Sequence, residues 1–246
     1  MKKTIYTLNV GDYAPKIREI TYPLLKFYAK KIGAEFFEIT ERKYPDFPPV
    51  YEKFQIYELG KEHGNDWNIF IDADAMVHPE FPDVTSQLTK DTVCFHGKDF
   101  SPIRFRPDKY FLRDGRNIGE GNWFAIASDW CLDLWHPLDD MTLVEALENI
   151  FPTMTELKTV VKRDHLIDDW LVSRNIARYG LKHIVMIDYF QQNLFTPDYL
   201  WHEYQMGIDQ KVVLMKQLLE KGMRVGMDGN VVSQPRWKGV LELCAL

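Results

Sequence analysis

The sequence predicts an α/β fold with a mainly parallel central sheet flanked by helices, built as a single domain over residues 1–246. Three observations predict it. Strand-like and helix-like hydrophobic patterns alternate through residues 4–77, and a buried strand pattern ends in two aspartates. The 246 residues, 46% of them hydrophobic, suffice for one sizeable core. Strand–helix–strand units of this kind cross over right-handedly and bind ligands at the carboxyl ends of their strands.

The elements of the first half alternate in type. Short runs rich in β-branched and aromatic side chains predict strands at residues 4–9 (TIYTLN), 34–40 (AEFFEIT) and 67–77 (WNIFIDADAMV). Apolar residues at helical spacing predict helices at residues 17–32 and 51–63, the second ended by Gly64. This order indicates successive β-α-β units.

Two local signals qualify these elements. Pro23 lies inside the first predicted helix, so we expect either a kink or a restart with Thr21 as N-cap. Gly11 and Asp12 predict a turn after the first strand, and residues 44–49 form a proline-rich loop.

The second half is more helical. Strand patterns occupy residues 93–96, 124–128 and 183–188, and helix patterns occupy residues 129–135, 163–179 (ended by Gly180) and 211–221. We expect Asp129 to cap the first of these helices. Thr142 and Glu145 have capping-box spacing, and Asp228 with Gly229 predicts the turn of a terminal hairpin.

Composition and charge argue against several classes of function. The 30 Lys and Arg against 36 Asp and Glu give a net charge of −6 without a long basic run, so we expect no nucleic-acid partner. The three cysteines lie far apart, which argues against a disulfide framework or a cysteine zinc site. With no secretory signal and no run of about 18 apolar residues, we expect a cytoplasmic protein without a transmembrane segment.

Asp72 and Asp74 carry the clearest chemical signal. They are separated by one residue at the carboxyl end of a strand pattern, where both carboxylates can converge on one cation. Such hard oxygen ligands suit Mg²⁺ or Mn²⁺, which completes its shell with water and substrate phosphates. Two solvated loop aspartates are the ordinary explanation of an isolated D-x-D, but carboxylates beside a buried strand are costly unless they are paired or bind metal.

The stretch WNIFIDADAMVHPEF, together with YTLN and the following GDY, resembles nucleotide-sugar glycosyltransferases of the GT-A fold. The similarity is to the glycogenin-like family and to the fungal mannosyl- and plant xylosyltransferase family. It implies a Rossmann-like, mixed sheet and transfer of a hexosyl or pentosyl group from a nucleoside diphosphate donor to a hydroxyl of a saccharide or glycoconjugate. It further implies a Mn²⁺ or Mg²⁺ cofactor and favours UDP as the nucleotide, with GDP left open.

The same resemblance implies roles for individual residues on the donor side. The first strand and loop would face the nucleoside through Thr7, Asn9, Asp12 and Tyr13. Asp72, Asp74 and His202 would hold the metal, and Asp72 would also lie at the substrate. Lys53, in YEKFQIYELG, would lie near the diphosphate or sugar, although a solvated helix lysine is the alternative. Gly207 and Lys211 would approach the phosphates, but their spacing departs from the family's histidine-x-x-glycine-x-x-lysine pattern.

The segment NIGEGNWF resembles the family's asparagine–glycine segment that contacts the transferred sugar. The resemblance favours Asn122 over Asn117 for this contact, and a glycine-rich hairpin is the alternative. Trp123 would give an apolar platform for a sugar ring or would be a core residue. Residues 139–162 match no family element and are treated as a possible acceptor-facing helical insertion.

The acidic segment RDHLIDDW resembles the segment from which GT-A enzymes place a carboxylate near the reaction centre. Asp168 and Asp169 rank equally as the catalytic carboxylate, followed by Asp164 as a substrate contact. The helix dipole favours acidic residues in a first turn and explains them without any chemistry. A carboxylate would accept the acceptor's proton if the product is inverted, whereas the departing phosphate would take it if configuration is retained.

Two other classes of function compete. In phosphatases of the haloacid dehalogenase superfamily a similar D-x-D supplies a nucleophile, here Asp72, and an acid/base, here Asp74. That motif usually lies on the first strand and is followed by glycine and threonine, whereas here Ala75 and Met76 follow it. A non-catalytic carbohydrate-binding protein on a transferase fold would bind sugar through aromatic residues without a metal.

Overall fold

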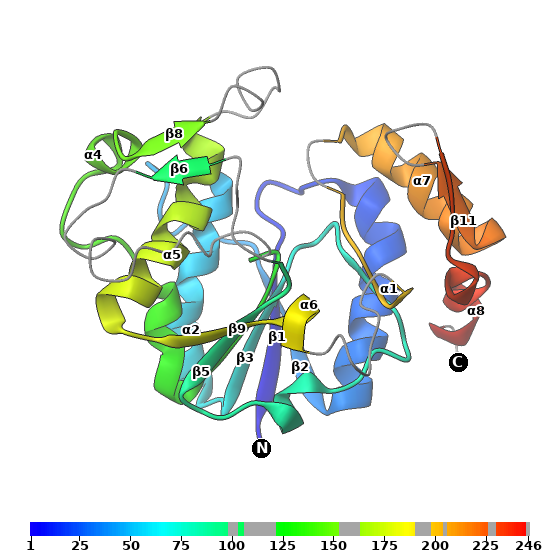
Figure 1. Ribbon diagram of the computed structural model, residues 1–246, viewed down its shortest axis with the longest axis horizontal. Coiled ribbons are helices and arrows are strands. Elements are labelled where there is room, and N and C mark those ends of the chain that lie inside the picture. The colour runs from blue at the N-terminus through cyan, green and yellow to red at the C-terminus, as the bar shows by residue number, and fades with distance from the viewer. Residues whose placement is uncertain are drawn as a thin grey trace.

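The computed structural model describes residues 1–97, 103–105, 122–152, 163–189, 198–203, 206–225 and 230–244. A six-stranded sheet forms its centre, with the strand order β2-β1-β3-β7-β5-β9 (Figure 1). The strands are β1 (Lys3–Leu8), β2 (Ala34–Ile39), β3 (Trp67–Ile71), β5 (Thr92–Phe95), β7 (Phe124–Ser128) and β9 (Lys182–Val185). Only β7 runs antiparallel to its neighbours in this sheet, which confirms the predicted α/β class with a mixed, mainly parallel sheet.

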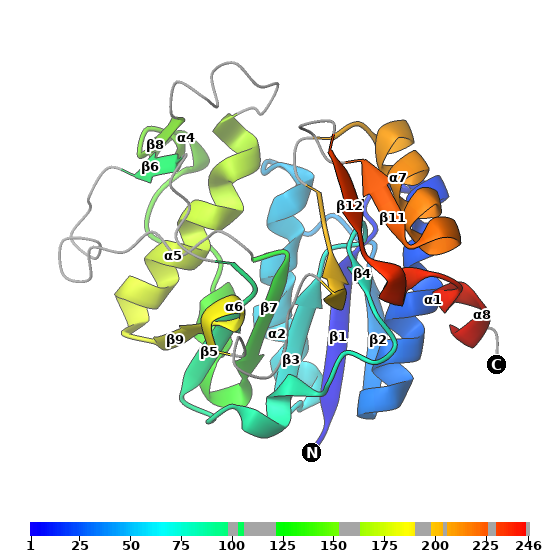
Figure 2. The ribbon, with the colours of Figure 1, turned by 45° about the vertical axis from the view of Figure 1, so that its right-hand side comes forward.

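Helices cover both faces of the sheet. On one face lies α1 (Pro15–Ile32), and on the other lie η1 (Pro49–Gln55), α2 (Ile56–His63), η3 (Asp129–Trp135) and α5 (Ile167–Tyr179). A further layer packs on α1, formed by α7 (Ile208–Lys221), η7 (Pro235–Trp237) and α8 (Val240–Cys244) (Figure 2). None of the described helices combines the length and apolar composition that crossing a bilayer requires.

The remaining elements are small. They are β4 (Met76–Val77), η2 (Val84–Gln87), β6 (Ile103–Phe105), α4 (Leu143–Leu147), β8 (Ile150–Pro152), η5 (Arg163–Leu166), α6 (Met186–Tyr189), β10 (Leu200–Trp201), β11 (Met223–Val225) and β12 (Val231–Ser233). Three antiparallel pairs join β4 to β10, β6 to β8 and β11 to β12.

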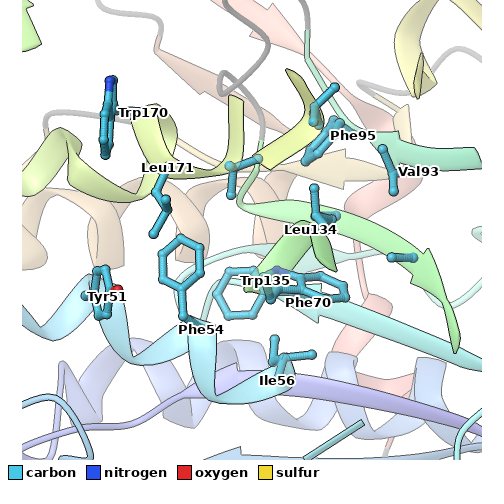
Figure 3. Close-up of a cluster of buried hydrophobic side chains, with 14 of the residues drawn as sticks. Tyr51, Phe54, Ile56, Phe70, Val93, Phe95, Leu134, Trp135, Trp170 and Leu171 are labelled. Atoms are coloured by element: carbon cyan, nitrogen blue, oxygen red, sulfur yellow. The ribbon is translucent and has the colours of Figure 1, made fainter. Parts of the chain in front are cut away.

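The core follows the pleat of the strands. Tyr6 and Phe70 face the α2 side of the sheet, whereas their neighbours Ile5 and Ile69 face α1. Figure 3 shows the first of these cores, where Phe54 of η1 and Trp135 of η3 lie close to the sheet residue Phe70. β3 is buried along its whole length, and Asp72 and Asp74 follow directly at its carboxyl end.

The helix α1 is continuous through Pro23, so the predicted restart at Thr21 is wrong. The Thr21 hydroxyl does not cap a helix. It donates to the carbonyl oxygens of Ile17 (3.3 Å) and Ala73 (2.6 Å) and so ties α1 to the loop after β3.

Several other boundaries differ from the predictions. The helix predicted at 51–63 begins as the 3-10 helix η1, and the strand predicted at 183–188 ends at Val185, after which Ile187 N–H donates to His96 O. Ser128, not Asp129, caps η3 by accepting from Trp130 N–H at 3.1 Å. The Asp129 carboxylate instead accepts from Lys90 at 2.9 Å, which explains why it does not cap.

Two local predictions are confirmed. Thr142 and Glu145 form a capping box at the start of α4. The hairpin pairs β11 with β12, with Arg224 opposite Val232, although the turn at Asp228 and Gly229 lies outside the described residues. The possible insertion at residues 139–162 contains α4 and β8, joined by loops, and its residues 153–162 lie outside the described part.

Candidate metal and substrate site

The two aspartates of the D-x-D segment lie in a tight turn directly after β3. Asp72 N–H donates to Trp123 O at 2.8 Å, and Ala75 N–H donates back to Asp72 O at 3.0 Å. The Thr21 hydroxyl fixes the carbonyl of the intervening Ala73. The backbone of the turn is therefore held from three sides, and this holds the two carboxylates close together.

His202 approaches these carboxylates from the far end of the chain. It follows β10, whose Trp201 pairs with Met76 of β4, only two residues after Asp74. The His202 Nε2 atom lies 3.4 Å from Asp74 Oδ1 and 3.8 Å from Asp72 Oδ2. One ligand atom from each residue lies within 4.8 Å of the others. Two carboxylates and an imidazole fit a divalent cation such as Mn²⁺ or Mg²⁺.

Two further side chains bind Asp74. The Lys211 ammonium forms a buried ion pair with its Oδ2, and the Tyr13 hydroxyl lies 3.4 Å from the same atom. Burial alone would raise the pKa of Asp74, but His202 and Lys211 outweigh it and hold that pKa well below the usual range. Burial raises the pKa of Asp72 despite the nearby Lys53, and burial also raises the pKa of Tyr13. Asp74 is thus the more firmly ionised of the two aspartates.

A second polar cluster surrounds Lys53. Its ammonium donates to Asn122 Oδ1 at 2.5 Å and to Asp168 Oδ2 at 2.6 Å, and the Asn122 amide donates to Asp169. Burial opposes the charge on Lys53, but the carboxylates of Asp168 and Asp72 overcome it and raise its pKa. Lys53 is only 2% exposed, so the expectation of a solvated helix lysine is wrong.

Two buried polar atoms near the carboxyl end of β1 lack a hydrogen-bond partner within the described part of the chain. Thr7 is fully buried, and neither its hydroxyl nor Asn9 Oδ1 has a hydrogen-bond partner among the described residues. The other end of the Asn9 amide donates to Glu38 of β2 at 2.9 Å, and the Tyr22 hydroxyl reaches the same carboxylate. These atoms can pair with the polar edge of a bound molecule.

The loop after β1 has an unusual backbone. Gly11, Asp12 and Ala14 all have positive φ, at 68°, 54° and 46°, and such strain in non-glycine residues gathers at functional sites. Arg18 holds this loop by an ion pair with the Asp12 carboxylate and by donating to Tyr13 O at 2.8 Å. The loop thereby places the Tyr13 hydroxyl at Asp74.

The remaining predicted residues lie apart from these contacts. Asp164 is half-buried in η5, and no polar contact joins it to Lys53 or to the metal cluster within the described residues. Gly207 is exposed at the N-terminus of α7, one turn before Lys211. Asn117 lies outside the described residues.

Sequence reasoning missed His96, which lies at the carboxyl end of β5 and contacts Trp123 with ring centroids 4.4 Å apart. Burial, with a contribution from His202, lowers the pKa of His96 to about 4, so its ring is neutral at pH 7. It also missed Glu38. Both lie near the carboxyl ends of strands of the parallel sheet, and the rule that ligands bind at those ends was the signal that could have indicated them.

Comparisons with known proteins returned structural similarities alone. No protein-family model and no curated protein matches the chain. A glycosyltransferase involved in glycosylation of the major capsid of PBCV-1 is similar with a TM-score of 0.49 and 10% identity, covering 88% of this chain and 100% of that one. The galactosyltransferase LgtC, in complex with donor and acceptor sugar analogues, gives a TM-score of 0.41 and 12% identity, covering 87% of this chain and 94% of LgtC. A197 from STIV gives a TM-score of 0.39 and 11% identity, covering 95% of this chain and 94% of A197. These scores are too low to assign a family or a reaction to this chain.

Proposed function

We propose that the protein is a metal-dependent glycosyltransferase that moves a sugar from a nucleoside diphosphate donor, with UDP favoured, to a hydroxyl of a saccharide or glycoconjugate. The observation that carries this proposal is the convergence of Asp72, Asp74 and His202 beside two buried lysines. Carboxylates and an imidazole suit a divalent cation, and lysines beside it suit the anionic phosphates that such a cation binds.

Asp72, Asp74 and His202 would hold Mn²⁺ or Mg²⁺, whose Lewis acidity stabilises the negative charge that develops on a departing diphosphate. Lys211 lies at the same site through its ion pair with Asp74. Its ammonium would contribute a fixed positive charge toward the phosphates, and the short loop carrying Tyr13 would close the site from the β1 side.

The Lys53 cluster would bind the transferred sugar. An ammonium, an amide and two carboxylates, from Lys53, Asn122, Asp168 and Asp169, offer donors and acceptors for several hydroxyl groups within one patch. This composition supports recognition of a polyhydroxylated ring, since each hydroxyl can both donate and accept.

During transfer, the acceptor oxygen bonds to the anomeric carbon while the bond from that carbon to the phosphate oxygen breaks. The hydroxyl proton then passes to a carboxylate or to the departing phosphate, according to the stereochemical outcome. Asp168 and Asp169 are the candidates for the carboxylate that takes this proton. Asp168 is paired with the Lys53 ammonium, and Asp169 accepts from the Asn122 amide and is more exposed.

The nucleoside would lie over the carboxyl end of β1. The buried Thr7 hydroxyl and Asn9 Oδ1 support this position, because neither has a hydrogen-bond partner among the described residues and a base edge that reached them would supply one. Asp12 and Tyr13 follow directly in the loop that leads to α1.

The first test is calorimetric binding of UDP, GDP and their sugar conjugates, each with Mn²⁺ present and with the metal chelated. We expect metal-dependent binding that Asp74→Ala abolishes. Asp91→Ala, which removes an exposed carboxylate paired with Lys182, is the matched control and should bind like the wild type.

Other outcomes would contradict the proposal in distinct ways. Absence of nucleotide binding under both conditions would remove its main support. A beryllium fluoride adduct on Asp72 would favour the phosphatase, and metal-independent sugar binding that survives Asp74→Ala would favour a non-catalytic carbohydrate-binding protein. If nucleotide binds, release of the diphosphate from a panel of sugar donors identifies the donor, and NMR of the product gives its anomeric configuration.

A further inference from the structure

Trp123 contacts two of the three candidate metal ligands, Asp72 and His202, which lie on segments far apart in the chain. Its carbonyl oxygen accepts from Asp72 N–H at 2.8 Å. Its indole ring stacks on the imidazole of His202, with ring centroids 4.9 Å apart and an interplanar angle of 17°. One residue therefore sets both the backbone of the first aspartate and the ring plane of the histidine.

The indole is itself held in place. Trp123 directly precedes β7, whose strand pairs with β3 on one side and β5 on the other. His96 packs against the indole at 4.4 Å and 47°. The backbone of His96 is fixed on both sides, because its N–H donates to Phe124 O at 3.0 Å and its carbonyl accepts from Ile187 N–H at 3.2 Å. The indole thus lies at the end of the central sheet and is packed against it, while His202 directly follows β10.

The stack determines where the ligating atom of His202 lies. With the ring parallel to the indole, Nε2 falls 3.4 Å and 3.8 Å from the two carboxylates. Rotation of the imidazole out of this plane would lose the stacking contact and carry Nε2 away from the aspartates. Ring pairs of this kind have a preferred geometry, and neighbours that orient a ligand contribute to metal affinity.

We infer that Trp123 is a positioning residue for the metal site, which orients the His202 imidazole toward the cation held by Asp72 and Asp74. This inference rests on the metal site of the proposed function. It gives Trp123 a role toward His202 that is separate from the sugar platform expected from the sequence.

The test measures Mn²⁺ affinity by calorimetry on the full chain without nucleotide. Trp123→Leu, which removes the flat ring, should weaken Mn²⁺ binding about 3- to 10-fold, as expected for loss of one orienting contact. Trp123→Phe keeps an aromatic face and should remain within about twofold of the wild type. Trp130→Leu removes an indole that is 68% exposed on η3 and is the matched control, with unchanged affinity expected.

A double-mutant cycle shows whether Trp123 acts through His202. In the His202→Ala background, Trp123→Leu should cause no further loss of Mn²⁺ affinity. Equal affinity of the wild type and Trp123→Leu would overturn the inference, and so would an equal loss in both backgrounds.

A spectroscopic measurement on the intact stack covers the case in which Trp123→Leu does not fold. The chain is labelled with 5-fluorotryptophan, and the Trp123 resonance is assigned by its absence in Trp123→Phe. Titration with diamagnetic Mg²⁺ should shift that resonance saturably in the wild type and leave it in place in His202→Ala. An unmoved resonance in the wild type would overturn the inference.

The inference and the proposed function fail differently. Mn²⁺ binding without any nucleotide binding would contradict the transferase and leave the Trp123 result standing. Absence of Mn²⁺ and Mg²⁺ binding to the wild type would overturn the inference together with the metal site.

Discussion

At the scale of single residues, the buried charge of Lys53 organises one half of the candidate site. Lys53 is 2% exposed, yet its ammonium is stabilised by Asp168 and Asn122 and lies 4.5 Å from the centre of the Phe70 ring. A buried charge of this kind is tolerated only because its partner is buried with it. The stability of the fold therefore depends on this pair, which is also a candidate sugar contact.

Lys53→Met should lower the free energy of unfolding by about 3–5 kcal/mol, because it leaves the Asp168 carboxylate buried without a cation. Adding Asp168→Asn removes that charge and should recover part of the loss. Urea unfolding of both variants measures the effect. Lys182→Met, which breaks an exposed pair with Asp91, is the control and should cost about 0–1 kcal/mol; equal losses for Lys53→Met and Lys182→Met would contradict the prediction.

At the scale of elements, Glu52 fixes the loop between β2 and η1. Its fully buried carboxylate accepts from the backbone N–H groups of Lys43 (3.0 Å) and Tyr44 (3.1 Å) and from the Gln55 amide (2.7 Å). The start of η1 depends on this carboxylate. So does the position of Lys53, which is the next residue in the chain.

Glu52→Gln should destabilise the fold by about 1–3 kcal/mol, because an amide group places donors against donors at a buried site. Thermal and urea unfolding measure the loss. Glu58→Gln is the matched control, since Glu58 is an exposed partner of Lys43 and its loss should cost no more than about 1 kcal/mol. A Glu52→Gln protein as stable as Glu58→Gln would contradict the role assigned to the buried carboxylate.

His78 directly follows β4 and hydrogen-bonds to the C-terminal layer, which is formed by α7, η7 and α8. This contact depends on the protonation of its ring. Its Nδ1 accepts from Glu80 N–H at 3.0 Å, so Nε2 carries the proton and donates to Arg236 O at 3.1 Å. Burial lowers the pKa of His78. The hydrogen bond to Arg236 O and the Glu80 carboxylate oppose this shift, and the positive charges of Arg236 and Lys31 add to it. The neutral ring is the one that fits both contacts.

Because the folded pKa of His78 lies below its ordinary value of about 6.5, the unfolded chain binds the proton more readily and stability falls as the pH drops below that value. Urea unfolding at pH 7.5 and pH 5.5 should show this loss. His96 adds to it in the same direction, so the measured quantity is the difference between the wild type and His78→Gln. An unchanged pH dependence in His78→Gln would exclude His78 as a contributor.

The elements that the sequence predicts best are those with a strong local period. The alternation of β1 and β2 and the buried run of β3 locate three neighbouring strands, and β3 in turn places Asp72 and Asp74 at its carboxyl end. The antiparallel direction of β7 could not be predicted this way, because it depends on pairing with β3 and β5. The cap of η3 failed for a similar reason, since Lys90 binds Asp129 from a distant segment.

At the scale of the whole molecule, the candidate metal site joins parts of the chain that are remote in sequence. Asp72 and Asp74 follow a central strand, His202 follows β10, and Lys211 comes from α7. The resemblance named these residues, but the stacking of Trp123 on His202 requires the folded sheet to bring the two rings together. Local sequence carries no signal for a contact of that kind.

A cation bound by Asp72, Asp74 and His202 should therefore fasten the C-terminal layer to the central sheet. At a free Mn²⁺ concentration 100 times the dissociation constant, binding should add about 2.7 kcal/mol to the free energy of unfolding. We expect a higher melting temperature and slower proteolytic cleavage within residues 198–244, both reversed by a chelator. His202→Ala should lose most of both effects, while Trp130→Leu should keep them. Stabilisation by Mn²⁺ that is equally large in His202→Ala would contradict this prediction, because the link between β10 and the D-x-D turn would then play no part in it.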